Sequence, residues 1–213
     1  MFIDSFFNII SKFHHNRISL YSKNLDFNNL IDIGTHKGEF LESFLKIKKI
    51  KKFYCFEPQK KIYDNLKKIF IKKNKIKLYN YALGDTCLNK KIYINNLTST
   101  STLSKFNHRS KYLKFKNFLT GTDLKNQKSY LVNQKTIDKV FKKISLKKTF
   151  VKIDVEGYEY KVLVGAQKKI NQLTYILVEN QFFNQYKNYG NIKKFLLKNN
   201  FEVVKNFYFP TFH

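Results

Sequence analysis

From residue 29 onward, short apolar runs alternate with longer stretches whose apolar residues recur at helical spacing. Runs typical of strands occupy 30–33, 52–57, 76–83, 149–155 and 175–179. Helical patterns lie between and after them, at 38–47, 59–72, 159–170 and 192–199. Because parallel strands need crossover connections, which are usually helices, this order predicts an α/β fold. We expect a mostly parallel, doubly wound, Rossmann-like sheet with helices on both faces.

The remaining segments suggest one domain with an N-terminal extension. Residues 2–14 have the spacing of an amphipathic helix, so 1–28 is expected to be a helix and lead-in, and 29–213 a single domain. A further helix near 136–144, an edge strand over 90–96 and a terminal strand over 201–209 are also predicted. The polar, lysine-rich segment 98–130 is predicted to be an irregular insert, and long loops of this kind are often functional.

The net charge of +26 allows two interpretations. Such an excess is typical of proteins that bind phosphates, either in nucleic acid or on an anionic membrane. However, 39 of the 41 basic residues are lysine, and Arg17 and Arg109 are the only arginines. Lys, Asn, Ile, Phe and Tyr are all abundant and all have AT-rich codons, so genome composition is the preferred explanation of the bias. Proteins that recognise phosphate or bases by shape usually rely on arginine.

Several features favour a cytoplasmic protein. No apolar stretch reaches the length of about 18 residues that a spanning helix requires. The N-terminal segment lacks a basic lead and contains Asp4, so it does not resemble a signal peptide. Cys55 and Cys87 form no CxxC pair, which favours free thiols in a reducing compartment. The N-terminal helix is expected to pack on the domain, with peripheral contact with a membrane as the alternative.

The ends of the first two predicted strands suggest a cofactor site. Asp32 lies at the end of the first strand, Gly34 and Gly38 follow it with GxxxG spacing, and Glu57 closes the second strand. An acidic residue at that second position can accept hydrogen bonds from the ribose hydroxyls of an adenosine. A dinucleotide site would require GxGxxG, whose second glycine admits the pyrophosphate, and Thr35 and His36 replace that arrangement here. The pattern therefore predicts S-adenosylmethionine, although the glycines could also serve packing alone.

Two later motifs add acidic residues to the same edge of the sheet. Asp85 follows the third predicted strand, where it could accept from the adenine amine or merely form a surface turn. Asp154 and Glu156 lie at the end of the fourth strand, near the expected position of the reactive end of the cofactor. Asp154 could either act as a base or orient the amino group of the cofactor.

In these motifs the chain resembles the FkbM family of methyltransferases over roughly residues 29–180. The most specific motif is Lys152-Ile153-Asp154-Val155-Glu156-Gly157. The others are Asp32-Ile33-Gly34 with Gly38, Phe56-Glu57-Pro58, Asn80-Tyr81-Ala82-Leu83-Gly84, Thr136-Ile137-Asp138, Glu159, Leu163, Gly165-Ala166 and the strand ending at Glu179. One departure is that family members commonly have Ala-Asn where this chain has Thr35-His36.

The resemblance implies a class I methyltransferase fold and transfer of a methyl group to oxygen, often on a sugar hydroxyl of a glycan or on a natural-product scaffold. We predict that Asp154 or Glu156 acts as the general base, with His36 as a third candidate. A Mg²⁺ site formed by Asp154, Glu179 and Asn180 is a minority alternative. The predicted cofactor-binding residues are Asp32, Gly34, Gly38, Glu57, Asp85 and Asp154.

Other functions remain open at this stage. The basic charge would suit an RNA methyltransferase, which would show strongly salt-dependent binding. A non-enzymatic adenosine sensor and a NAD-dependent enzyme are weaker alternatives, because the acidic set is intact and the central glycine is missing. The segment Thr98–Thr102 and the regions around Tyr112 and Tyr186 are predicted acceptor-side surfaces, since hydroxyl and aromatic groups suit sugars.

Overall fold

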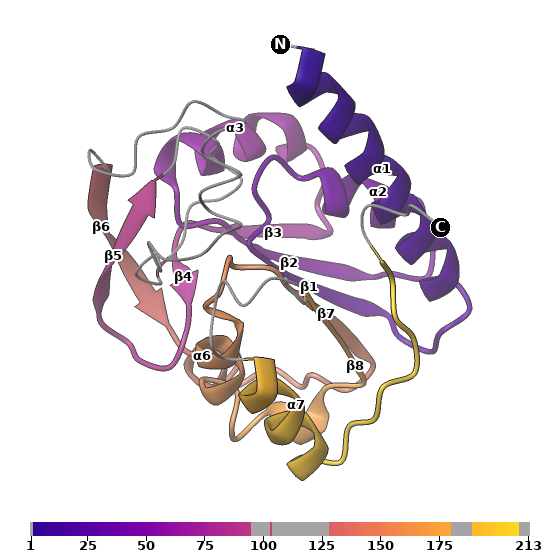
Figure 1. Ribbon diagram of the computed structural model, residues 1–213, viewed down its shortest axis with the longest axis vertical. Helices are drawn as coiled ribbons and strands as arrows, with labels where there is room; N and C mark the ends of the chain where they lie inside the picture. Colours follow the sequence, from indigo (N-terminus) through magenta and orange to yellow (C-terminus); the bar gives the residue numbers. More distant parts are fainter. Residues whose placement is uncertain (1, 95–102, 104–127, 180–188, 209–213) are drawn as a thin grey trace.

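The computed structural model describes residues 2–94, 103, 128–179 and 189–208, and a parallel five-stranded sheet lies at its centre (Figure 1). The strand order is β3-β2-β1-β7-β8. The strands are β1 (Asn29–Ile33), β2 (Lys52–Phe56), β3 (Ile76–Tyr79), β7 (Thr149–Ile153) and β8 (Tyr175–Val178). The chain starts in the middle of the sheet, builds one side through β2 and β3, and later returns to build the other. The doubly wound parallel sheet predicted from the sequence is therefore confirmed.

Helices cover both faces of this sheet, as expected (Figure 1). One face carries α1 (Phe2–Ser22), α2 (Glu39–Leu45) and α3 (Lys60–Phe70). The other carries α5 (Ile137–Val140), α6 (Glu159–Val164), the 3-10 helix Ile170–Gln172 and α7 (Tyr189–Lys198). The N-terminal helix is part of this packing, because the Ser19 hydroxyl donates to the Ser43 carbonyl of α2 at 2.8 Å.

Alternation along the strands explains the two cores. Leu30 of β1 lies beside Phe150 of β7, and both belong to the core under α1, α2 and α3. The next pair, Ile31 and Val151, belongs to the core under α5, α6 and α7. Because successive side chains of a strand point to opposite faces, a central strand must be apolar on both. This requirement makes each polar residue at a strand end conspicuous.

A smaller sheet of order β4-β6-β5 lies beside the main one (Figure 1). It consists of β4 (Ala82–Leu83), β5 (Asn89–Ile94) and β6 (Lys128–Lys135). The predicted edge strand over 90–96 corresponds to β5, and its last two predicted residues, 95 and 96, lie outside the described residues. β6 was not predicted. The prediction that 98–130 is irregular is wrong for residues 128–130, which belong to β6. In β6 only Val132 and Gln134 are buried, so its apolar pattern is too weak to indicate a strand.

Three predicted boundaries are also wrong. The first helix continues beyond residue 14 to Ser22, because Ile18 and Ser22 are buried on its inner side. The predicted strand 76–83 is divided into β3 and β4, and in the turn between them the Asn80 amide donates to the carbonyls of Glu57 and Pro58. Residues 201–208 form no strand, and Phe209 lies outside the described residues.

Candidate active site

The loops after β1 and β7 meet where the winding of the sheet reverses direction. β1 and β7 are neighbours in the sheet although more than 100 residues of chain separate them. The Asp154 N–H donates to the Ile33 carbonyl at 3.1 Å, and a Cβ on Gly34 would lie 1.9 Å from the Asp154 carbonyl oxygen. Open α/β sheets bind ligands at this switch point, beyond the carboxyl ends of the strands.

The glycine loop is shaped by packing at both of its glycines. Gly34 has φ +80° and touches the β7 loop, while Gly38 has φ +91° and would clash with Leu66 and Phe70 if it carried a Cβ. The glycines alone therefore do not indicate a ligand. His36 also adopts a left-handed conformation, with φ +50°. Asn and His tolerate this region better than most residues, which accounts for the departure from Asn at this position.

Lys152 connects the two loops. Its ammonium group donates to the Gly34 carbonyl at 2.8 Å and lies 3.4 Å from Asp32 Oδ1 and 3.2 Å from Asp154 Oδ2. Lys152 and Asp32 are register partners on adjacent strands, so their side chains emerge on the same face. The two carboxylates raise the pKa of Lys152, despite its burial, and keep it charged. Lys152 belongs to the most specific sequence motif, but its spacing along the chain gave no indication of this role.

Asp32 forms the floor of the site. Its side chain is fully buried, and burial raises its pKa although Lys152 opposes the shift. Asp154 lies above it with 38% of its side chain exposed. Burial disfavours its ionisation, but the charge of Lys152 outweighs this effect and lowers the pKa of Asp154. Lys152 thus holds one carboxylate beneath the loops and one that can reach a ligand.

Glu57 closes β2 and is almost completely buried. Its two oxygens accept hydrogen bonds from the backbone N–H groups of His36, at 2.9 Å, and Gln59, at 2.8 Å. Burial raises the pKa of Glu57, although these two hydrogen bonds and the charge of His36 act to lower it. The carboxylate therefore joins the glycine loop to the start of α3. His36 Nδ1 lies 3.5 Å from Glu39 Oε1.

Carboxyl groups gather around the loop after β7. Loss of surrounding water and the nearby charges of Asp154 and Glu156 raise the pKa of Glu179 well above its usual range, although its side chain keeps an exposed edge. The contact between the two side chains lowers the pKa of Asp154 and raises that of Glu179, so Glu179 takes up a proton more readily than Asp154. The predicted residues Asp154, Glu156 and Glu179 are therefore brought together in space.

Glu159 organises the same loop from beneath. Glu156 and Gly157 have φ +53° and +90°, an uncommon left-handed pair. The Glu159 Oε1 atom accepts from the N–H groups of Val155, at 3.2 Å, and Gly157, at 2.9 Å. Burial raises the pKa of Glu159 to about 7. Glu156 is consequently presented by a turn that a buried carboxyl group holds in place.

His15 of α1 reaches this region from outside the predicted site. Its ring contacts Phe40 edge-on at 5.6 Å, and the Lys152 ammonium lies 5.7 Å from the centre of the same Phe40 ring. Burial and the charge of Lys152 lower the pKa of His15 to about 4, although Asp154 and Glu39 act in the opposite direction. The helix predicted from residue spacing ended at residue 14, so the sequence gave no sign of this approach by His15.

Asp85 lies in a separate cluster with α6. It pairs with Lys161 at 2.7 Å and accepts from Tyr158 Oη at 3.3 Å, and these contacts lower its pKa against the effect of burial. Gln134 of β6 approaches it at 3.5 Å. The structure therefore does not join Asp85 to the carboxyl groups of the β7 loop, and its contact with adenine remains a prediction.

The alternative of a Mg²⁺ site at Asp154, Glu179 and Asn180 receives no support from the described residues. Within the described part of the chain, no three His, Cys, Asp or Glu side chains are arranged to hold a metal ion. Asn180 lies outside the described residues, as do Thr98–Thr102, Tyr112 and Tyr186, so the predicted acceptor surfaces have no structural account. No helix among the described residues is long and apolar enough to cross a bilayer.

Comparison with known families agrees with this geometry. The family model described as Methyltransferase FkbM domain matches residues 32–203, well over half of the chain. The chain belongs to the FkbM methyltransferase family. No curated protein matches it.

Three FkbM motifs that are distant in sequence meet in the structure. A Cβ on Gly165 would lie 1.9 Å from the Gly84 carbonyl oxygen, and the Asp138 N–H donates to the Gly165 carbonyl at 3.0 Å. Gly84, Asp138 and Gly165 therefore serve the junction of β4, α5 and α6. The motifs around Gly34, Glu57 and Lys152 serve the switch point. The family pattern contains both a structural junction and a candidate site.

Proposed function

We propose that this FkbM methyltransferase uses S-adenosylmethionine to methylate a hydroxyl oxygen, with a sugar of a glycan or glycoconjugate as the acceptor. The observation that carries the proposal is the partly exposed, ionised Asp154 at the switch point, beside Glu156 and opposite the Glu57 loop. The cofactor supplies an electrophilic methyl group on a sulfonium. What the protein must provide is binding, orientation and a route for the hydroxyl proton.

Glu57 suits the ribose of the cofactor. A carboxylate has about four lone-pair positions, and the hydrogen bonds from His36 and Gln59 use two of them. The remaining positions are available to ribose hydroxyl groups once the loop admits the nucleoside. The same two backbone bonds fix the direction of the carboxylate beforehand, which lowers the cost of ordering it on binding.

Asp154 suits the ammonium group of the amino-acid portion. Lys152 keeps it ionised, and a carboxylate with a lowered pKa is a good partner for a cation but a weak proton acceptor. Of the two roles predicted for Asp154, the geometry therefore favours orientation. Asp32 lies beneath Lys152 and acts as a positioning residue through it.

Glu156 is then the preferred general base. Its left-handed turn presents it beside Asp154 at the mouth of the site, and Glu159 holds that turn. With the cofactor bound, the Glu156 carboxylate would take the hydroxyl proton as the oxygen–carbon bond forms and the carbon–sulfur bond breaks, which releases S-adenosylhomocysteine. Alignment of the reacting atoms can contribute about 7–11 kcal/mol, so only moderate acid–base assistance is needed.

Calorimetric titration tests cofactor binding directly. Wild-type protein should bind S-adenosylmethionine and S-adenosylhomocysteine, and Glu57→Ala should weaken both strongly. Glu42→Ala, which removes an exposed carboxylate from the neighbouring helix α2, is the matched control and should bind normally. Preferential binding of NAD, or binding that is unaffected by Glu57→Ala, would contradict the proposal.

The role of Glu156 requires a separate measurement. Glu156→Gln should reduce turnover by roughly 10²–10⁴-fold, the usual contribution of a general base, and leave cofactor affinity unchanged. Asp154→Asn should instead weaken cofactor binding. If Glu156→Gln retains full turnover in an assay with an active acceptor, the proton takes another route, and His36→Gln is the next variant to compare.

An RNA methyltransferase is the second candidate, and the net charge of +26 favours it. The two functions differ in the acceptor and in its response to salt. RNA binding should weaken steeply as salt increases, because several phosphates release counterions when they bind. Methyl transfer to RNA in preference to sugar acceptors, with that salt dependence, would replace the glycan assignment.

A further inference from the structure

The outer side of α1 carries an apolar stripe formed by Ile9, Phe13 and Leu20. Their exposed fractions are 53%, 68% and 70%. At 100° per residue, these positions fall within about 40° of one another around the helix. Single exposed apolar residues are ordinary, but three large ones aligned on one helix indicate a surface that is covered in use.

The packing of α1 shows that this stripe is not its core-facing side. Ile18 and Ser22 are buried, and Ser19 is hydrogen bonded to α2. The stripe faces away from these contacts, and the N-terminal end of α1 projects beyond the other elements (Figure 1). The helix therefore has one apolar side committed to the fold and another that the fold leaves open.

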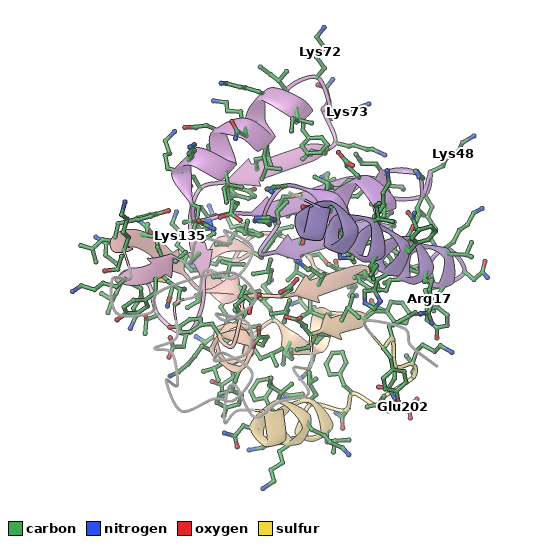
Figure 2. All side chains as sticks on the ribbon, turned by 45° about the horizontal axis from the view of Figure 1, so that its top comes forward. Arg17, Lys48, Lys72, Lys73, Lys135 and Glu202 are labelled. Atoms are coloured by element: carbon green, nitrogen blue, oxygen red, sulfur yellow. The ribbon has the colours of Figure 1, made fainter. Side chains whose placement is uncertain are left out.

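Basic residues accompany the stripe without acidic ones. Lys12, Arg17 and Lys23 are exposed on α1 or directly after it, and the sequence contains no Asp or Glu from residue 9 to residue 25. Arg17 is one of only two arginines in the chain. Figure 2 shows it well separated from the lysine pair Lys72 and Lys73 at another end of the molecule.

The C-terminal segment contacts the end of α1 and exposes two further apolar side chains. Phe207 contacts Tyr21 of α1 edge-on at 5.5 Å, so residues 201–208 reach the C-terminal part of α1 (Figure 1). Within that segment, Val203 and Val204 have exposed fractions of 66% and 60%.

We propose that this protein docks on an anionic phospholipid surface through α1, with Ile9, Phe13 and Leu20 inserted at the level of the acyl chains and Lys12, Arg17 and Lys23 at the headgroups. An amphipathic helix with a basic border is suited to lie in that interface. α1 is not long and apolar enough to cross a bilayer, and the proposal places it parallel to the membrane surface.

Charge distinguishes lipid from the other occupants. A second copy of the chain would also carry +26, and the same basic border would repel it. Nucleic acid would satisfy the basic residues but offers no apolar phase for the stripe. An anionic bilayer supplies both partners. The inference does not depend on the chemistry proposed for the candidate site.

Vesicle flotation tests this docking with two matched triple variants of the full chain. Wild type should bind phosphatidylcholine vesicles that contain phosphatidylserine, and Ile9→Ser/Phe13→Ser/Leu20→Ser should bind them at least roughly tenfold more weakly. The control is Ile69→Ser/Ile71→Ser/Leu88→Ser, which removes apolar residues of similar exposure, 59%, 70% and 63%, outside α1. It should bind as wild type does. Circular dichroism verifies that each variant is folded.

A second pair of variants tests the charges. Lys12→Gln/Arg17→Gln/Lys23→Gln should weaken binding by up to roughly a hundredfold, since each basic residue near an anionic surface contributes about fivefold. Lys67→Gln/Lys72→Gln/Lys73→Gln, with the same loss of charge on and after α3, should have a much smaller effect.

Three results would overturn the inference. Equal loss in both charge variants, with no effect of the apolar variant, would show general adsorption of a basic protein. Equal binding to vesicles of phosphatidylcholine alone would remove the role of anionic lipid. A dimer in sedimentation velocity that the α1 apolar variant converts to a monomer would assign the stripe to a second copy of the chain.

Discussion

Two lysine–carboxylate clusters in this protein have similar chemistry and very different surroundings. In the switch-point cluster, Lys152 is 7% exposed and lies 3.4 Å from the fully buried Asp32. In the α6 cluster, Lys161 is 47% exposed and lies 2.7 Å from Asp85. The shorter distance therefore belongs to the more exposed pair. Burial, not distance, decides how much each pair matters, because water and salt screen an exposed pair and cannot reach a buried one.

The largest expected effect comes from removing the buried cation. Lys152→Met should lower the free energy of unfolding by roughly 3–5 kcal/mol, because it leaves Asp32 charged or forces it to take up a proton in a buried position. Chemical denaturation measures this difference. Asp32→Asn in the Lys152→Met background should recover part of the loss, since the uncompensated charge is then gone. A loss below about 1 kcal/mol for Lys152→Met would show that both clusters behave as surface pairs.

Glu159 extends the comparison of the two clusters to a buried carboxyl group that has no lysine partner among the described residues. Backbone N–H groups donate to it, and no lysine charge is among the main causes of its pKa shift. Its pKa is about 7 in the folded protein and about 4.5 in the unfolded chain. The stabilisation from its protonated form is complete below pH 4.5 and is lost as the pH rises to 7, by up to roughly 3 kcal/mol. Glu159→Gln should abolish this contribution to the pH dependence of unfolding. An unchanged profile would mean that the group ionises normally.

His15 should give the opposite slope. Its pKa is about 4 in the folded protein and 6.5 in the unfolded chain, so its contribution is complete above pH 6.5 and is lost as the pH falls to 4. Because its ring is partly exposed, we expect less than about 3 kcal/mol. His15→Gln should therefore make unfolding less sensitive to acid in this range. Equal sensitivity of wild type and variant to acid would show that burial and the charge of Lys152 do not lower the pKa of His15.

The smallest effect is expected at the exposed pair. Lys161→Met should change the free energy of unfolding by less than about 1 kcal/mol, and that change should shrink further in high salt. Thermal denaturation at low and high salt measures both quantities. A loss as large as that for Lys152→Met would show that the hydrogen bonds of Asp85 with Tyr158 and Gln134 depend on Lys161 far more than its exposure suggests.

The main sheet could be predicted because its signal is local. Each central strand is apolar on both faces and is followed by an amphipathic helix, so type and order can be read from spacing alone. β6 could not be predicted, because pairing with β5 rather than its own apolar pattern stabilises it. The turn at Asn80 depends on carbonyl groups of residues 57 and 58, which the spacing of residues 76–83 does not reveal.

The sequence by itself determined the α/β class, the family motifs and the placement of Asp32, Glu57 and Asp154 at strand ends, because these follow from periodicity and order along the chain. Only the tertiary structure decided how the charges are paired. It placed Asp32 beneath Lys152, brought His15 from α1 to Phe40, and directed Asp85 to Lys161. The physical reason is that burial and the field of neighbouring charges arise from contacts between distant segments, and no local pattern encodes them.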